Sequence, residues 1–192
     1  INSTIENIKS SLSDINNNEE RYIQFKYISN NIDEPLNPSG GSYLSINLNL
    51  HGTILGGVNN FIKIKNEYRK FLKFPNNNII AFRIINGYIE TFGTSVNINK
   101  YKFKLGGHTT LRGWSSSEKT QYPNGNLISN LVNIEYRISL YKNWGTYLFF
   151  DSAHLFNSIN KLSKTPNIWD YGLGFIYNTN LGPIRLDFGI PY

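Results

Sequence analysis

The chain of 192 residues contains no cysteine and no methionine. Without cysteine it has neither a disulfide framework nor a thiolate metal site. Because methionine is missing even at position 1, we expect the sequence to begin inside a longer gene product. Alanine, the best helix former, occurs only at Ala81 and Ala153, which disfavours a helical protein.

Long apolar runs and catalytic motifs are also missing. No stretch approaches the roughly 20 apolar residues of a membrane-spanning helix, and no signal peptide is present. His51, His108 and His154 lie far apart, and no two of them have the spacing of metal ligands. There is no GxSxG nucleophile motif and no phosphate-binding glycine loop. We therefore expect no enzyme activity, no metal and no cofactor.

The formal net charge of +6 could suit nucleic acid or an anionic lipid surface. However, the lysines are dispersed singly through alternating segments and form no block. No nucleic-acid partner is expected from this distribution.

Aromatic residues are abundant, with 13 tyrosines and 12 phenylalanines, which favours strands. From Tyr22 onward, apolar residues recur at every second position, as in Leu44, Ile46 and Leu48. The pattern predicts eight strands, at about 22–27, 44–51, 62–69, 79–88, 132–139, 145–153, 171–177 and 184–190.

Strands that are apolar on one face and polar on the other fit two architectures. A soluble sandwich buries the apolar face, whereas a transmembrane barrel turns it toward lipid. The strand lengths favour the barrel, since about 9–11 residues cross a bilayer when tilted. The polar face carries charges of both signs within strands, including Lys63, Arg83 and Glu135.

The connections between the expected strands differ strongly in length. Those at Tyr141–Trp144 and Thr179–Gly182 are short, whereas a loop of about 91–125 is long, an asymmetry typical of outer-membrane barrels. A closed eight-stranded barrel is too narrow for charged walls and a folded loop. We therefore predict an all-β, antiparallel transmembrane β-barrel whose eight strands form one arc of a larger barrel.

Residues 1–20 follow a different pattern. Apolar residues recur there at helical spacing, which predicts an outer loop with a short amphipathic helix. The partial barrel is then expected to occupy 21–192. The apolar positions are Ile1, Ile5, Ile8, Leu12 and Ile15.

The segment Lys104–Trp114, KLGGHTTLRGW, stands out within the long loop. Gly106 and Gly107 permit tight turns, and Arg112 precedes Gly113 and Trp114. On the residues alone, this is either an ordinary glycine-rich loop with a solvated arginine or a tightly folded loop that holds the charge of Arg112 at its tip.

Several stretches together resemble the outer-membrane insertase superfamily of the BamA/TamA type, also called the bacterial surface antigen family. LGGHTTLRGW is similar to the family's sixth outer loop, NIEYRISL to the strand after it, and YLFFDSAHLF to the next strand. YGLGFIYNTNLGPIRLDFGIPY resembles the following pair, and DEPLNPSGGSYLSI a periplasmic turn with its strand entry. Asp151-Ser152-Ala153 departs mildly from the family's Asp-Ala-Gly or Asp-Met-Gly.

This resemblance implies the C-terminal part of a barrel of about sixteen strands in the outer membrane of a Gram-negative bacterium or an organellar equivalent. Upstream POTRA domains, the first half of the barrel and a closing strand would be missing from this chain. The implied function is insertion or translocation of nascent outer-membrane or secreted proteins through a lateral strand seam. A two-partner-type secretion pore, a passive porin and a barrel-anchored enzyme are the alternatives.

The resemblance also gives the loop a partner on the wall, through the inward Glu135 and the acidic Asp151. Alternation puts both carboxylates on the lumen face of neighbouring strands, where they repel unless a cation lies between them. We hypothesise that Arg112 fills that position and pins the loop. Asp170, Arg185 and Asp187 are interpreted as solvated lumen polarity, with a charge network as the alternative.

Overall fold

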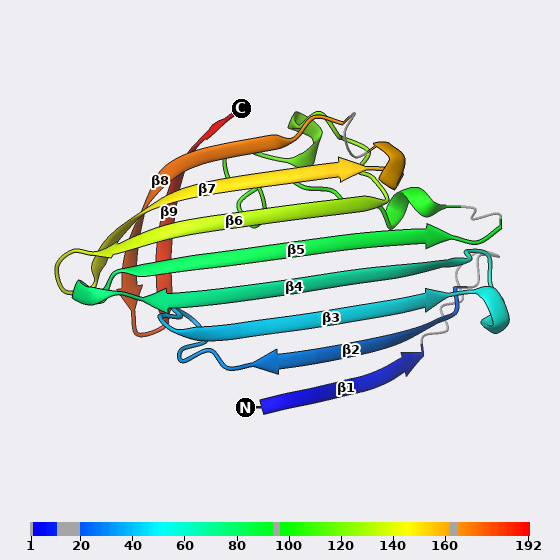
Figure 1. The fold of residues 1–192 in the computed structure, drawn as a ribbon, viewed down its shortest axis with the longest axis horizontal. Coiled ribbons are helices and arrows are strands. Elements are labelled where there is room, and N and C mark those ends of the chain that lie inside the picture. Colours follow the sequence, from blue (N-terminus) through cyan, green and yellow to red (C-terminus); the bar gives the residue numbers. More distant parts are fainter. Residues whose placement is uncertain (1, 11–19, 94–96, 162–164) are drawn as a thin grey trace.

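A computed structural model describes residues 2–10, 20–93, 97–161 and 165–192. The chain forms one antiparallel sheet in which every strand pairs with its neighbour in sequence (Figure 1). The eight expected strands are all present as β2 to β9. The strands within the described residues are β1 Asn2–Ser10, β2 Tyr22–Asn30, β3 Gly41–His51, β4 Phe61–Lys73, β5 Ile79–Thr91, β6 Ile128–Ser139, β7 Trp144–Phe156, β8 Ile168–Thr179 and β9 Gly182–Pro191.

Consecutive antiparallel pairing puts the connections alternately at two ends of the sheet. One end carries the short turns, such as 140–143 and 180–181, and the other carries the longer loops, including 92–127. Short 3-10 turns lie in these connections, and within the described residues no helix is long and apolar enough to cross a membrane. They are η1 Thr53–Leu55, η2 Pro75–Asn77, η3 Ile98–Lys100, η4 Ser117–Lys119 and η5 Ile159–Lys161.

The two faces of the sheet differ as the alternation predicts. On β6, Leu131, Asn133 and Glu135 are buried, whereas Ile134 and Tyr136 between and beside them are 39% and 40% exposed. Large apolar side chains continue along this exposed face into β9, where Leu186 and Phe188 are more than half exposed. The charged residues Glu67, Arg83, Glu135 and Arg185 lie on the opposite face, an arrangement that suits lipid outside and polar groups inside.

The sheet is curved and open. Arg185 on β9 contacts Glu135 on β6 at 2.8 Å, although two strands lie between them. Neighbouring strands are about 4.8 Å apart, so this contact requires strong curvature toward the charged face. Figure 1 shows the same bend at β8 and β9. Among the described residues β1 and β9 do not pair, so the predicted arc, and not a closed barrel, is confirmed.

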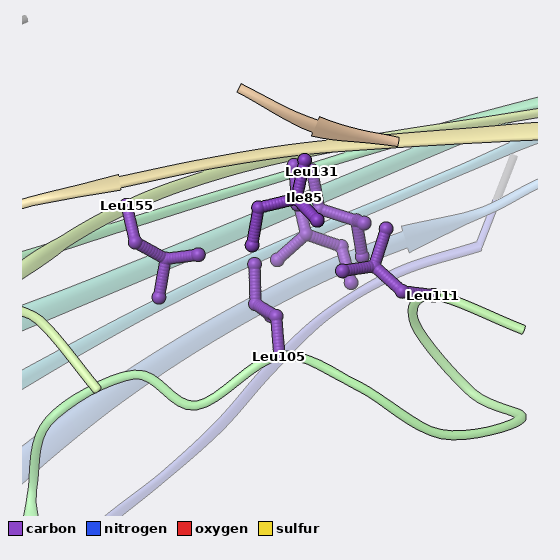
Figure 2. Close-up of a cluster of buried hydrophobic side chains, with 7 residues drawn as sticks. Ile85, Leu105, Leu111, Leu131 and Leu155 are labelled. Carbon is purple, nitrogen blue, oxygen red and sulfur yellow. The ribbon is translucent and has the colours of Figure 1, made fainter. Parts of the chain in front are cut away.

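The loop residues 97–127 lie against the concave face and supply part of the main apolar core. Leu105 and Leu111 of the loop point toward Ile85, Leu131 and Leu155 of the sheet (Figure 2). All five side chains are at most 8% exposed. Apolar residues at the loop end of the concave face are therefore buried by the loop, while many of those on the convex face, such as Leu148 and Phe188, are exposed.

The amphipathic helix expected within 1–20 is not formed over Asn2–Ser10, which is β1, so the sheet begins before residue 21. The rest of that expectation, 11–19, lies outside the described residues. A register shift between Glu6 and Lys9 adds one residue to β1, so the spacing of three between Ile5 and Ile8 spans a bulge. Pairing with β2 also stabilises this segment through backbone hydrogen bonds between strands, whereas an isolated short helix is only marginally stable in water.

The division into two faces predicts the reactivity of single cysteines in the full-length protein in lipid vesicles. Ile134→Cys should react slowly with a water-soluble maleimide because lipid covers the convex face. Lys65→Cys, on the exposed part of the concave face, should react faster. Faster labelling at position 134 would mean that the apolar face meets water, which contradicts the barrel.

Candidate functional site

Strand register arranges the concave face in rows that cross the sheet. One row runs through Arg69, Arg83, Asn133, Asp151 and Asp170, each opposite the next on neighbouring strands. The next row contains Phe71, Ala81, Glu135, Phe149 and Gly172. The candidate site lies where the loop tip meets these two rows.

Arg112 bridges the two carboxylates of the wall. Its Nε and Nη2 donate to the two oxygens of Asp151 at 2.8 and 2.7 Å, and its Nη1 donates to Glu135 Oε1 at 2.5 Å. The side chains of Arg112 and Asp151 are 6% and 0% exposed. The paired geometry is the one that a guanidinium favours with a carboxylate. The structure thus brings together the three residues that the sequence hypothesis joined.

Neighbouring side chains make further contacts with Arg112 and Asp151. The Arg112 guanidinium lies 3.9 Å from the centre of the Phe149 ring, which adds a cation–π contact. Asn133 Nδ2 donates to both Asp151 Oδ1 and the backbone carbonyl of Thr110, each at 2.7 Å. The loop is therefore attached through its backbone as well as through the arginine.

Glu135 is also the centre of a wider charge network. Its Oε1 accepts from Arg185 at 2.8 Å, and its Oε2 accepts from Arg137 at 2.8 Å. Arg185 further donates to the Tyr147 hydroxyl, which in turn donates to Asp187. The interpretation of Arg185 and Asp187 as merely solvated polarity is therefore wrong, because curvature brings β9 over the rows of β6 and β7.

The glycines of the motif have distinct structural roles. Gly106 and Gly107 have φ angles of 141° and 95°, a region that favours glycine. The Gly107 N–H donates to the Trp114 carbonyl at 2.6 Å and closes the tip of the loop. Trp114 is partly buried and packs against the main core, so it anchors the chain just after the arginine.

Gly113 lets the loop backbone touch the wall. A Cβ at this position would lie 2.7 Å from Asp170 Cβ and 3.0 Å from the Pro191 nitrogen. A Cβ on Gly189 would in turn lie 2.7 Å from Gly113 Cα. The two glycines thus face each other, and Asp170 beneath them is fully buried, so its expected solvation is also wrong.

A second attachment point was missed by the sequence interpretation. Phe103 of the loop lies over Gly87 of β5, where an added Cβ would be 2.5 Å from the ring. Lys63 donates to the Tyr101 carbonyl at 2.7 Å, and its ammonium lies 4.7 Å from the Phe103 ring centre. Gly87 lies in the middle of an otherwise regular strand, and a glycine at such a position is the sequence signal for the close packing of another group, here the Phe103 ring.

The contacts of Arg112 with Glu135 and Asp151, called the clamp below, hold the loop tip against the strands. The charged members of the clamp, Arg112, Glu135 and Asp151, pair with one another. In the part of the chain that the structure describes, no group of three or more His, Cys, Asp or Glu side chains could hold a metal ion. Removing one member of such a buried pair leaves an uncompensated charge, which costs about 3–5 kcal/mol.

Fold and site together define a membrane β-barrel wall with an arginine-bearing loop folded into its lumen. Residues 2–192 match the Omp85 superfamily domain. The chain belongs to the Omp85 superfamily, whose barrels lie in the outer membrane. The resemblance drawn from the motifs is thereby confirmed.

A solved structure shares this fold. The crystal structure of BamA from Haemophilus ducreyi lacking POTRA domains 1–3 matches with a TM-score of 0.77 and 18% sequence identity. The match covers 91% of this chain and 39% of that one, so the chain spans less than half of the structure that it resembles.

The clamp predicts that Arg112→Ala loosens the loop tip in the full-length protein. The unpaired Asp151 and Glu135 should lower the free energy of unfolding in urea by about 3–5 kcal/mol, and proteinase K should cut near Thr109. Lys104→Ala, which removes an exposed cation from the same loop, is the control. Unchanged protection in Arg112→Ala would show that the clamp does not hold the tip.

The second attachment predicts a separable effect of Gly87→Val. The added side chain displaces Phe103, an overpacking that typically costs about 1–3 kcal/mol. New cleavage should appear near Tyr101 to Phe103 while the tip near Thr109 stays protected. Thr91→Val, a near-isosteric change on the same strand and face, should leave the digestion pattern unaltered. Cleavage at the tip alone would contradict two independent anchors.

Proposed function

We propose that this chain forms the C-terminal wall of an outer-membrane barrel that inserts or translocates other outer-membrane proteins. Its seam is a weakly paired strand edge, which templates incoming strands by main-chain hydrogen bonding. The observation that carries the proposal is the match of residues 2–192 to the Omp85 superfamily domain. The partners are outer-membrane lipid, nascent client proteins and POTRA domains upstream in the full-length protein.

The loop clamp supports a mechanical role within this function. An open seam weakens a barrel, so the remaining wall must keep its curvature by other contacts. Arg112 and Arg185 both hold Glu135, which ties the loop, β6 and β9 together inside the lumen. The proposed role of Arg112, Glu135 and Asp151 is to brace the wall, and no covalent step is involved.

A two-partner-type secretion pore is the second candidate, since the same loop and wall suit it. A passive porin and a barrel-anchored enzyme draw no support from any contact described above. The two leading candidates differ in the final location of the client protein. An insertase leaves the client in the bilayer, whereas a secretion pore releases it on the other side of the membrane.

The proposed function predicts that the full-length protein in proteoliposomes accelerates the folding of an outer-membrane client into the bilayer. Insertion is measured as the heat-modifiable, protease-resistant form of the client. Arg112→Ala should slow insertion severalfold because the wall is no longer braced, whereas Lys104→Ala should match the unmodified protein.

Release of the client into the opposite compartment, with none in the bilayer, would identify a secretion pore. If neither product exceeds that of empty vesicles, the proposed function is wrong. Equal rates for Arg112→Ala and the unmodified protein would remove the bracing role alone.

A further inference from the structure

Two arginines face each other on the concave wall beside the clamp. Arg69 on β4 and Arg83 on β5 are direct cross-strand partners, an arrangement that is destabilising for like charges. A single oxygen, Glu67 Oε1, accepts from Arg69 Nε at 2.6 Å and from Arg83 Nε at 2.8 Å. Two guanidinium groups thus share one carboxylate, which leaves one positive charge in excess.

The charge network beside these two arginines is balanced. Arg112, Arg137 and Arg185 bind Glu135 and Asp151, and Asp187 joins them through Tyr147. Three cations therefore face three anions in that network. Among the residues that line the adjoining cavity, the positive charge left over after this pairing lies at Arg69 and Arg83.

Both arginines line a cavity of about 770 Å³ below the loop tip. Small-molecule sites commonly have about 300–1,000 Å³. The side chains of Arg69 and Arg83 are 40% and 27% exposed, so they remain accessible, whereas the Arg112 side chain is 6% exposed. Leu36 and Phe71 line the same cavity and add apolar surface.

We propose that Arg69 and Arg83 form an oxyanion-binding site in the lumen, which takes a carboxylate or phosphate group of a ligand in this cavity. Glu67 engages Nε and Nη2 of Arg69 and Nε of Arg83. Each guanidinium keeps further N–H donors, and its planar fork suits an oxyanion. Because Arg83 Nη1 also donates to the Thr109 carbonyl at 2.8 Å, the site touches the loop tip. The apolar lining favours an acidic peptide segment as the source of the oxyanion.

The test uses the full-length protein in detergent and a fluorescein-labelled tetraglutamate peptide, followed by fluorescence anisotropy at fixed ionic strength. A labelled tetraglutamine peptide corrects for binding of the dye. Arg69→Gln and Arg83→Gln should each weaken binding by about tenfold or more, the usual effect of losing a hydrogen bond between charged groups. Lys65→Gln, which removes a cation from the same strand and face outside the cavity, should leave affinity within about twofold.

Glu67→Gln gives a test with the opposite sign. Removing the carboxylate that occupies both arginines should tighten binding of tetraglutamate, whereas a merely structural role for Glu67 would weaken it. Heat-modifiable migration verifies that each variant is folded.

Competition by inorganic phosphate separates the two sources of oxyanion. Displacement of the peptide by phosphate supports a site for a bare oxyanion, and its absence supports a peptide-specific site. No binding of either probe, an equal loss in Lys65→Gln, or unchanged affinity in Arg69→Gln and Arg83→Gln overturns the proposal.

Discussion

Two of the carboxylates buried on the inner wall of the β-sheet, Asp151 and Glu135, impose the main constraint on this structure. Asp151 is fully buried and Glu135 nearly so, and neither can remain charged there without a cation. The cation comes from a loop inserted between β5 and β6, so the loop must fold inward and stay there. The inward path of residues 97–127, with its glycines and its leucines, suits that requirement.

The loop is attached to the sheet at two positions, and apolar side chains between them pack against the sheet. Arg112 fixes the tip to β6 and β7, and Phe103 fixes the shoulder over Gly87 of β5. Between these points Leu105 and Leu111 pack onto the wall. An element held by charge, shape and apolar contact at once resists displacement better than one held by a salt bridge alone.

The polar interior also links strands that the hydrogen-bonded ladder does not join directly. Glu135 on β6 binds Arg185 on β9 across two intervening strands, and the Tyr147 ring lies over Gly174, where a Cβ would be 2.2 Å from it. Glycines on β8 therefore make room for the side chains that cross above them. The curvature of the sheet, the glycines of β8 and the charge network therefore depend on one another.

The sequence by itself determined the strands and their faces, because alternation is a local property that each segment carries within it. It also indicated Arg112, Glu135 and Asp151, through the resemblance of the loop and the two strands after it to a known family together with the alternation that turns both carboxylates inward. Only the tertiary structure decided that β1 is a strand, that Gly87 seats Phe103, and that Arg185 and Asp187 belong to one network. These features depend on pairing and on curvature, which bring together residues far apart in the chain and leave no periodic trace in it.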